Sequence, residues 1–172
     1  MTRIIGLDFG SKRIGVAVSD ELGVLAIPHG VLQRRSYNKD AAWISGLVSE
    51  MKAERVVLGW PVGLSGDPTE QTRRAQQFGE MLATRVPVPV GWWDERLTTV
   101  VARGISLQSR GAARTPRRAA QSRHEGLTRG PEGLDAIAAA VILQGYLDHL
   151  RRLADSDARL AGSGEAGEPL AS

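Results

Sequence analysis

The feature that most constrains the fold is an apolar segment near the N-terminus that contains one carboxylate. Residues 3–9, RIIGLDF, have the apolar run of a buried strand, and Asp8 lies inside it. A buried carboxylate without a partner is energetically costly and tends to protonate. Asp8 therefore either begins a turn at the end of the strand, or it is held in place to meet a cation.

An alternation of strands and helices follows this first strand. After a turn at 10–13, the pattern predicts a hairpin partner at 14–19 and an edge strand at 24–32, which contains Pro28. Asp67 is expected to cap a helix. The remaining predicted elements are helices over 40–53, 67–84, 98–107 and 134–153, and strands over 55–59 and 86–93. This order predicts an α/β fold with a five-stranded mixed sheet and helices on both faces.

The composition narrows the possible chemistry. The chain has no cysteine, and its histidines, at positions 29, 124 and 149, are scattered. A metal would therefore need oxygen ligands, which favours Mg²⁺ or Mn²⁺. No apolar run approaches the roughly 18 residues of a membrane span. The N-terminus has no signal-like segment, so we expect a cytoplasmic protein without membrane contact.

Three acidic positions are expected to meet at one edge of the sheet. Right-handed crossovers make the later strands parallel to the first, so Asp8 and the pair Asp94–Glu95 share the edge where ligands bind. Neighbouring strand residues face opposite sides, so only one of that pair can face Asp8, and the longer Glu95 is favoured. Asp135 begins the last helix.

Each of these acids alone has a simple explanation as a turn former or as a helix N-terminal residue. Together they would repel one another unless a cation neutralises them. Two Mg²⁺ ions about 4 Å apart, bridged by carboxylates, would relieve this repulsion and make a phosphodiester-cleaving site.

Basic residues suggest a polyanionic partner. The segment 103–129 contains seven arginines and one acid, Glu125, a pattern that suits nucleic acid. We expect 108–133 to be a mobile basic loop inside a domain of residues 1–153, followed by a disordered acidic tail at 154–172. The expected nucleic-acid contacts are Lys12, Arg13, Arg96, Arg110, Arg114, Arg117, Arg118 and Arg123.

Four motifs in order resemble the YqgF (RuvX) family of small bacterial nucleases: GLDFGSKRIGVAVSD, VVLGWPVGLSGDPTEQTRRAQQFGEML, DERLTT and LDAIAAAVILQGYLD. The resemblance implies a ribonuclease H-like fold, a divalent-metal site and a role in maturing the 5′ end of precursor 16S ribosomal RNA. By motif position, it implies Asp8, Glu95 and Asp135 as catalytic and metal-binding residues. The chain departs from the family pattern at 107–133, where it is longer and rich in glycine and arginine.

Several functions remain open. The leading one is a Mg²⁺- or Mn²⁺-dependent nuclease that acts on precursor ribosomal RNA. The alternatives are a Holliday junction resolvase, which would cut branched DNA as a dimer, and a non-catalytic RNA-binding or ribosome-assembly module. The chain could act as a monomer or a homodimer. An ATP-binding relative of actin and sugar kinases would need two such domains, which 172 residues cannot supply.

Overall fold

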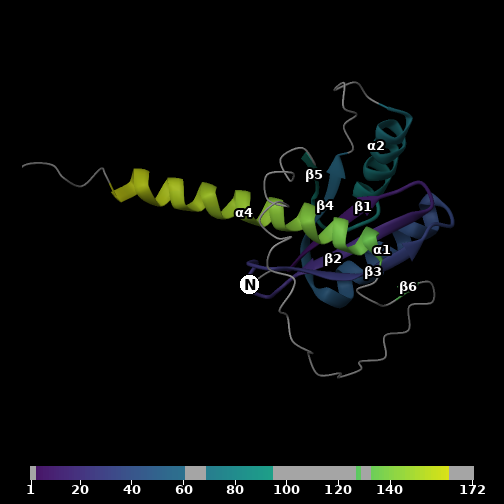
Figure 1. Cartoon of the computed structure of the whole chain (residues 1–172), viewed down its shortest axis with the longest axis horizontal. Helices are drawn as coiled ribbons and strands as arrows, with labels where there is room; N and C mark the ends of the chain where they lie inside the picture. Colours follow the sequence, from purple (N-terminus) through teal and green to yellow (C-terminus); the bar gives the residue numbers. More distant parts are fainter. Residues whose placement is uncertain (1–2, 61–68, 95–126, 129–132, 163–172) are drawn as a thin grey trace, which may run out of the picture.

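The computed structural model describes residues 3–60, 69–94, 127–128 and 133–162 (Figure 1). Its strands are β1 (Arg3–Phe9), β2 (Arg13–Ser19), β3 (Ala26–Gln33), β4 (Ala53–Trp60), β5 (Val90–Asp94) and the two-residue β6 (Leu127–Thr128). Its helices are α1 (Tyr37–Met51), α2 (Glu70–Ala83) and α4 (Leu134–Gly162). The predicted helix at 98–107 lies outside the described residues.

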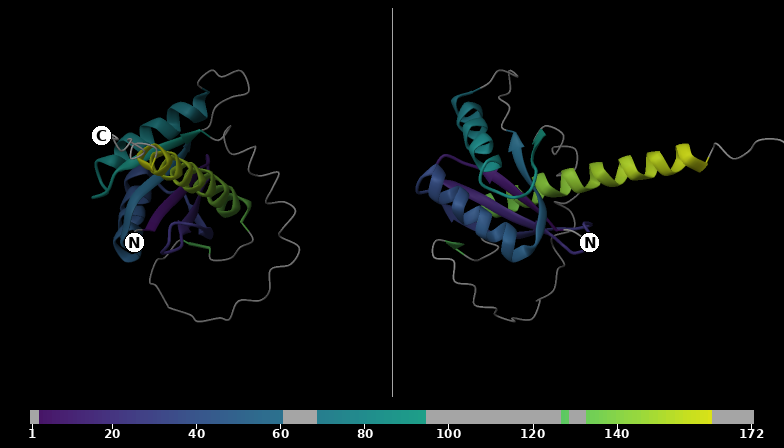
Figure 2. Two further views of the ribbon diagram at one scale, coloured as in Figure 1. Left: turned by 90° about the vertical axis from the view of Figure 1, so that its left-hand side faces the viewer. Right: turned by 180° about the vertical axis from the view of Figure 1, so that it is seen from behind.

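The strands form one mixed sheet in the order β5-β4-β1-β2-β3-β6. β1, β2 and β3 are antiparallel neighbours, whereas β4 and β5 run parallel to β1. Helices α1 and α2 cover one face, and α4 crosses the other (Figure 2). The predicted mixed sheet with helices on both faces is therefore confirmed, and its five predicted strands are β1 to β5. The two-residue β6 adds a sixth strand, which pairs with Val31 and Leu32.

The pleat of β1 decides which side Asp8 faces. Ile5, Leu7 and Phe9 belong to the core under α1 and α2. The residues between them, Gly6 and Asp8, therefore face α4, because side chains alternate along a strand. This alternation is the reason that a carboxylate is compatible with an otherwise apolar strand.

The ends of α1 and α2 differ from the sequence prediction. α1 begins at Tyr37, three residues early, because the Ser36 hydroxyl accepts a hydrogen bond from the Lys39 amide. Thr69, and not the predicted Asp67, caps α2, and it exchanges hydrogen bonds with Thr72 in a capping box.

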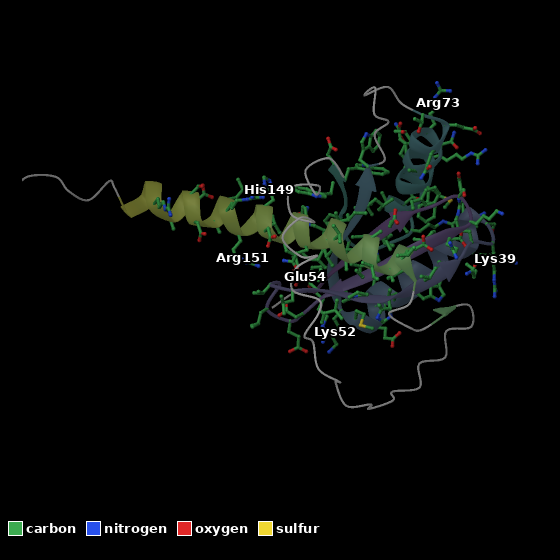
Figure 3. The ribbon with its side chains drawn as sticks, viewed as in Figure 1. Lys39, Lys52, Glu54, Arg73, His149 and Arg151 are labelled. Carbon is green, nitrogen blue, oxygen red and sulfur yellow. The ribbon has the colours of Figure 1, made fainter. Side chains whose placement is uncertain are left out.

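The C-terminal helix also differs from its prediction. α4 continues to Gly162 and crosses the boundary expected at residue 153. Residues 154–162 are therefore helical and not disordered, whereas 163–172 lie outside the described residues. Beyond His149 and Arg151 the helix projects away from the sheet, and the side chains of 151–159 are exposed (Figure 3). None of the described helices combines the length and apolar character needed to cross a bilayer.

α4 is fixed to the turn between β2 and β3. The Gln144 side chain accepts from the Ala26 amide and donates to the Val24 carbonyl oxygen, at 2.9 and 3.0 Å. Within the turn, the amides of Leu25 and Val24 donate to the Asp20 carboxylate, and this lowers the pKa of Asp20. The middle of α4 therefore has polar as well as apolar contacts with the sheet.

Two strand glycines allow α4 to lie directly on the backbone of the sheet. A Cβ atom at Gly6 would lie 2.6 Å from the Cβ of Leu143. A Cβ atom at Gly15 would overlap the carbonyl oxygen of Asp135 in the first turn of α4. The position of Asp135 relative to β1 and β2 therefore depends on residue 15 being a glycine, which has no Cβ atom.

We predict that Gly15→Ala lowers the free energy of unfolding by about 1–3 kcal/mol, because the first turn of α4 must move away. Gly91→Ala is the matched control, since it is also a strand glycine but a Cβ there has no neighbour within 4 Å. Urea denaturation of the two variants measures the difference. Equal stability of the two variants would show that α4 approaches β2 less closely than described.

Candidate active site

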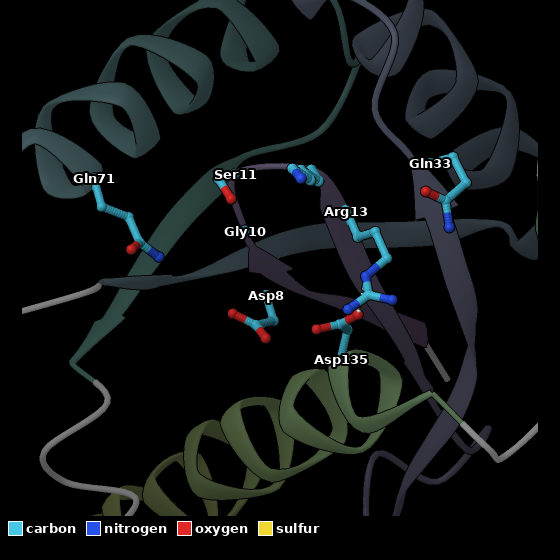
Figure 4. A pocket seen from close by; sticks show the side chains of 8 residues that line it. Asp8, Gly10, Ser11, Arg13, Gln33, Gln71 and Asp135 are labelled. Atoms are coloured by element: carbon cyan, nitrogen blue, oxygen red, sulfur yellow. Dashed lines mark ion pairs between the residues drawn. The ribbon is translucent and has the colours of Figure 1, made fainter.

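Asp8 and Asp135 lie together at the carboxyl edge of the parallel strands. Asp8 comes from the end of β1, and Asp135 comes from the first turn of α4. Figure 4 shows their carboxyl groups facing one open cavity, which has a volume of about 540 Å³. The residues that line it are Asp8, Gly10, Ser11, Lys12, Arg13, Gln33, Gln71 and Asp135.

The start of α4 places Asp135 at this cavity. The amides of Ala136 and Ile137 donate to the Gly133 carbonyl oxygen, so the helix begins directly beside β2. A carboxylate in the first turn of a helix is favoured by the helix dipole. The Asp135 side chain keeps 31% of its surface exposed, which leaves it accessible to a ligand.

Arg13 is the present partner of Asp135. Its Nε atom lies 2.8 Å from Oδ2 of Asp135, and the arginine side chain is 56% exposed. Water screens such a pair, so it contributes at most about 1 kcal/mol to stability. A ligand with a higher charge can therefore displace Arg13 at little energetic cost.

The donor set suits a hard cation. Asp8 and Asp135 supply carboxylate oxygens, and Mg²⁺ commonly binds through one or two carboxylates together with substrate phosphates. Among the described residues, no three acidic or histidine side chains gather as a metal site. The third predicted ligand, Glu95, lies outside the described residues.

The faces of β5 separate Asp94 from this cavity. Trp92 packs over Gly79 of α2, whereas Trp93 contacts the rings of Tyr146 and His149 on α4. Asp94 is paired in register with Trp60, and it follows Trp93 in the alternation. Asp94 therefore belongs to the α2 side of the sheet, and Asp8 to the α4 side.

The predicted nucleic-acid contacts divide into two groups. Lys12 and Arg13 line the cavity beside the two carboxylates. The others lie outside the described residues: Arg96, Arg110, Arg114, Arg117, Arg118 and Arg123.

Sequence reasoning missed several residues that form this region. Gln33 and Gln71 also line the cavity, from the end of β3 and the first turn of α2. Glutamines at element ends carry no pattern that distinguishes them from ordinary surface residues. Gly15 carried a usable signal, because a glycine inside a strand indicates close approach of another backbone.

Arg34 was also missed, and it fixes the β1–β2 turn that carries Lys12. Its Nη1 atom donates to the carbonyl oxygens of Gly10 and Ser11, at 3.0 and 3.1 Å. Its backbone amide donates to the Lys12 carbonyl oxygen at 3.0 Å. Its guanidinium also stacks 4.2 Å above the centre of the Phe9 ring. One residue therefore binds three successive carbonyls of the turn.

A buried carboxylate balances the charge of Arg34. Asp40 of α1 is 1% exposed, and its Oδ2 lies 3.7 Å from Arg34 Nε, too far for a hydrogen bond. Asp40 Oδ1 accepts from the Arg35 amide at 3.0 Å. Because the Arg34 side chain is 14% exposed, most of this ion pair is removed from water.

We predict that Arg34→Met lowers the free energy of unfolding by about 2–3 kcal/mol, because it leaves the Asp40 charge buried without a partner. The double variant Arg34→Met/Asp40→Asn should recover part of this loss, since an amide oxygen still accepts from Arg35. Chemical denaturation of the single and double variants measures the coupling. A double variant that is no more stable than Arg34→Met would contradict the ion pair.

Comparison with known proteins gives the family. The sequence model of the family described as "RuvX: Holliday junction resolvase" matches residues 2–149. A protein of Agathobacter rectalis named "Putative pre-16S rRNA nuclease" is 42% identical over 151 residues, which cover 86% of this chain and 96% of the relative. A protein of Syntrophomonas wolfei with the same name is 39% identical over 146 residues, covering 85% and 94%.

Solved structures agree on the fold. Thermus thermophilus RuvC, in complex with a Holliday junction substrate, superposes with a TM-score of 0.58 at 14% identity and covers 88% of this chain and 96% of that one. A second Thermus thermophilus RuvC structure gives a TM-score of 0.52. This likeness confirms the predicted ribonuclease H-like fold. The match of the family model over residues 2–149 and the relatives at 42% and 39% identity show that the chain belongs to the RuvX family.

Proposed function

We propose that this protein is a divalent-metal-dependent nuclease that hydrolyses phosphodiester bonds, with Asp8 and Asp135 among its metal ligands. The observation that carries the proposal is the meeting of these two carboxylates in one open cavity that Lys12 and Arg13 also line. Carboxylates beside cationic side chains suit a metal ion together with a phosphate group.

Each group at the cavity has a role in this proposal. Asp8 and Asp135 would hold the cation, which would neutralise charge at the phosphate and lower the pKa of an attacking water. Lys12 contacts a phosphate oxygen as a point charge. Arg13, whose pair with Asp135 is exposed to water, would donate to the phosphate, for which its planar guanidinium is well shaped.

We propose Glu95 as the third carboxylate. The alternation of Trp92, Trp93 and Asp94 between the two faces of β5 supports this choice. A residue that followed the same alternation after Asp94 would face α4, on the side of Asp8. This argument favours Glu95 over Asp94 as the ligand that shares a cation with Asp8.

The names of the relatives indicate the substrate class. Two relatives at 42% and 39% identity are named as pre-16S rRNA nucleases, so we propose that the cytoplasmic substrate is precursor ribosomal RNA. The family description favours a second candidate, resolution of Holliday junctions. Symmetric cutting of a junction requires two active sites, and so a dimer.

A substrate comparison separates these functions. Cleavage of precursor 16S RNA fragments, single strands and four-way DNA junctions is measured with Mg²⁺ and with Mn²⁺. Preferential cutting of the RNA fragments supports the first function, and paired symmetric cuts in the junction support the second. RNA binding without cleavage under either metal would favour a binding module and contradict the nuclease proposal.

We predict that Asp8→Asn and Asp135→Asn each reduce cleavage by at least about two orders of magnitude, because each removes a carboxylate charge from the cation site. Asp157→Asn is the matched control, since Asp157 is exposed on the projecting part of α4. Thermal unfolding with and without Mg²⁺ gives a second measurement. Mg²⁺ should raise the Tm of the natural protein and of Asp157→Asn more than that of the two site variants.

Two results would contradict this assignment. If Asp8→Asn cleaves as fast as the natural protein, Asp8 is not a metal ligand of the active site. An identical Mg²⁺-dependent rise in Tm in all four proteins would show that the ion binds elsewhere.

A further inference from the structure

A second cavity lies on the other side of the β1–β2 turn. It has a volume of about 540 Å³ and shares Ser11, Lys12 and Gln33 with the candidate active site. Its full lining is Ser11, Lys12, Gln33, Arg34, Arg35, Ser36, Tyr37 and Arg74. The tip of the hairpin therefore separates the cavity that holds the two carboxylates from one lined by four cationic side chains and no acidic one.

The charges of this second cavity are only partly neutralised. None of its described lining residues is acidic. Arg34 is paired with the buried Asp40, and Arg74 is paired with Glu70 one turn earlier on α2. Lys12 and Arg35 make no ion pair within the described part of the chain. The cavity therefore has a positive potential that an anion would reduce.

The floor of the cavity is fixed before any ligand arrives. Arg34 is held by the Gly10 and Ser11 carbonyls and by stacking on Phe9. Tyr37 lies on Phe9 and Phe78 in an aromatic cluster, and its hydroxyl donates to the Arg74 carbonyl oxygen at 3.4 Å. These contacts connect the turn, α1 and α2. The floor of the cavity therefore loses little conformational freedom when a ligand binds.

We propose that this cavity is a second phosphate subsite, in which Arg35 and Arg74 bind a backbone phosphate of the strand that is cut between Asp8 and Asp135. The proposal rests on the proposed nuclease function and deepens it. A strand that enters the candidate active site and continues over Ser11 and Lys12 reaches the second cavity directly. Guanidinium groups suit a phosphate diester, because they donate two parallel hydrogen bonds.

The first test measures the salt dependence of binding. A fluorescein-labelled single-stranded RNA is titrated in EDTA with the natural protein, Arg35→Gln and Arg74→Gln. Each variant should bind several-fold more weakly, with a slope of log K against log[salt] that is smaller by about 0.7. Arg73→Gln and Arg55→Gln are matched controls, because these exposed arginines do not line the cavity and should leave the slope unchanged.

A variant that is expected to bind RNA more tightly strengthens the test. Glu70→Gln removes the carboxylate that pairs with Arg74 and leaves the cationic lining intact. We expect it to bind the same RNA more tightly, with a steeper salt slope. Weaker binding by Glu70→Gln would overturn the proposal.

A second experiment locates the phosphate. RNA oligonucleotides with one neutral methylphosphonate linkage, placed in turn on either side of the cut, are compared in binding. One such linkage should weaken binding to the natural protein and have no further effect on Arg35→Gln. If a methylphosphonate at every position weakens binding to Arg35→Gln as much as binding to the natural protein, the subsite proposal is wrong.

The outcomes separate the subsite from the function on which it rests. If the natural protein cleaves RNA and Arg35→Gln keeps its affinity and slope, the subsite is wrong and the nuclease function stands. If the natural protein binds neither RNA nor DNA, both are wrong. If millimolar inorganic phosphate displaces the RNA from the natural protein and Arg35→Gln equally, the cavity does not hold the strand.

Discussion

The contact between α4 and the backbone of the sheet at Gly6 and Gly15 is the constraint on which the site depends. Without Cβ atoms at these positions, the first turn of α4 lies against β2, and Asp135 reaches the cavity beside Asp8. The pleat of β1 sends its apolar side chains toward α1 and α2, which leaves Asp8 on the same side as α4. Two acids far apart in sequence therefore meet because a strand face and a helix end are both fixed by packing.

The β1–β2 turn is held in a different way. Its carbonyls are bound by Arg34, whose charge is balanced by an almost fully buried Asp40. A buried ion pair contributes little net stability, but it penalises any arrangement that separates its partners. In this fold it favours a single position for Lys12 and Arg13, the two cations nearest the carboxylates. The buried Arg34–Asp40 pair therefore helps to fix the positions of two cations at the surface.

Much of this arrangement was predictable from the sequence. The alternation of strands and helices and the parallel order of β4 and β5 with β1 follow from periodicity and crossover handedness. The meeting of Asp8 with Asp135 was expected from the position of Asp135 in the first turn of a helix that packs on the sheet. The helix boundaries were less predictable, because Thr69 and Asp67 are both good caps and only one is used. The Arg34–Asp40 pair could not be predicted, since their side chains meet only after α1 packs on the sheet, and neither residue belongs to a periodic pattern.

The placement of the candidate active site and a basic cavity on opposite sides of one turn has an electrostatic consequence. Lys12 and Arg13 line the first cavity beside its two carboxylates, so its formal charges cancel and it has no net charge that attracts a phosphate until a cation is present. The basic cavity has no such requirement, because its cationic side chains outnumber their acidic partners. In the proposed function, a strand would therefore be held beside the site before a cation binds there. The water-exposed pair between Arg13 and Asp135 is weak, so an ion of higher charge can replace Arg13 beside this carboxylate.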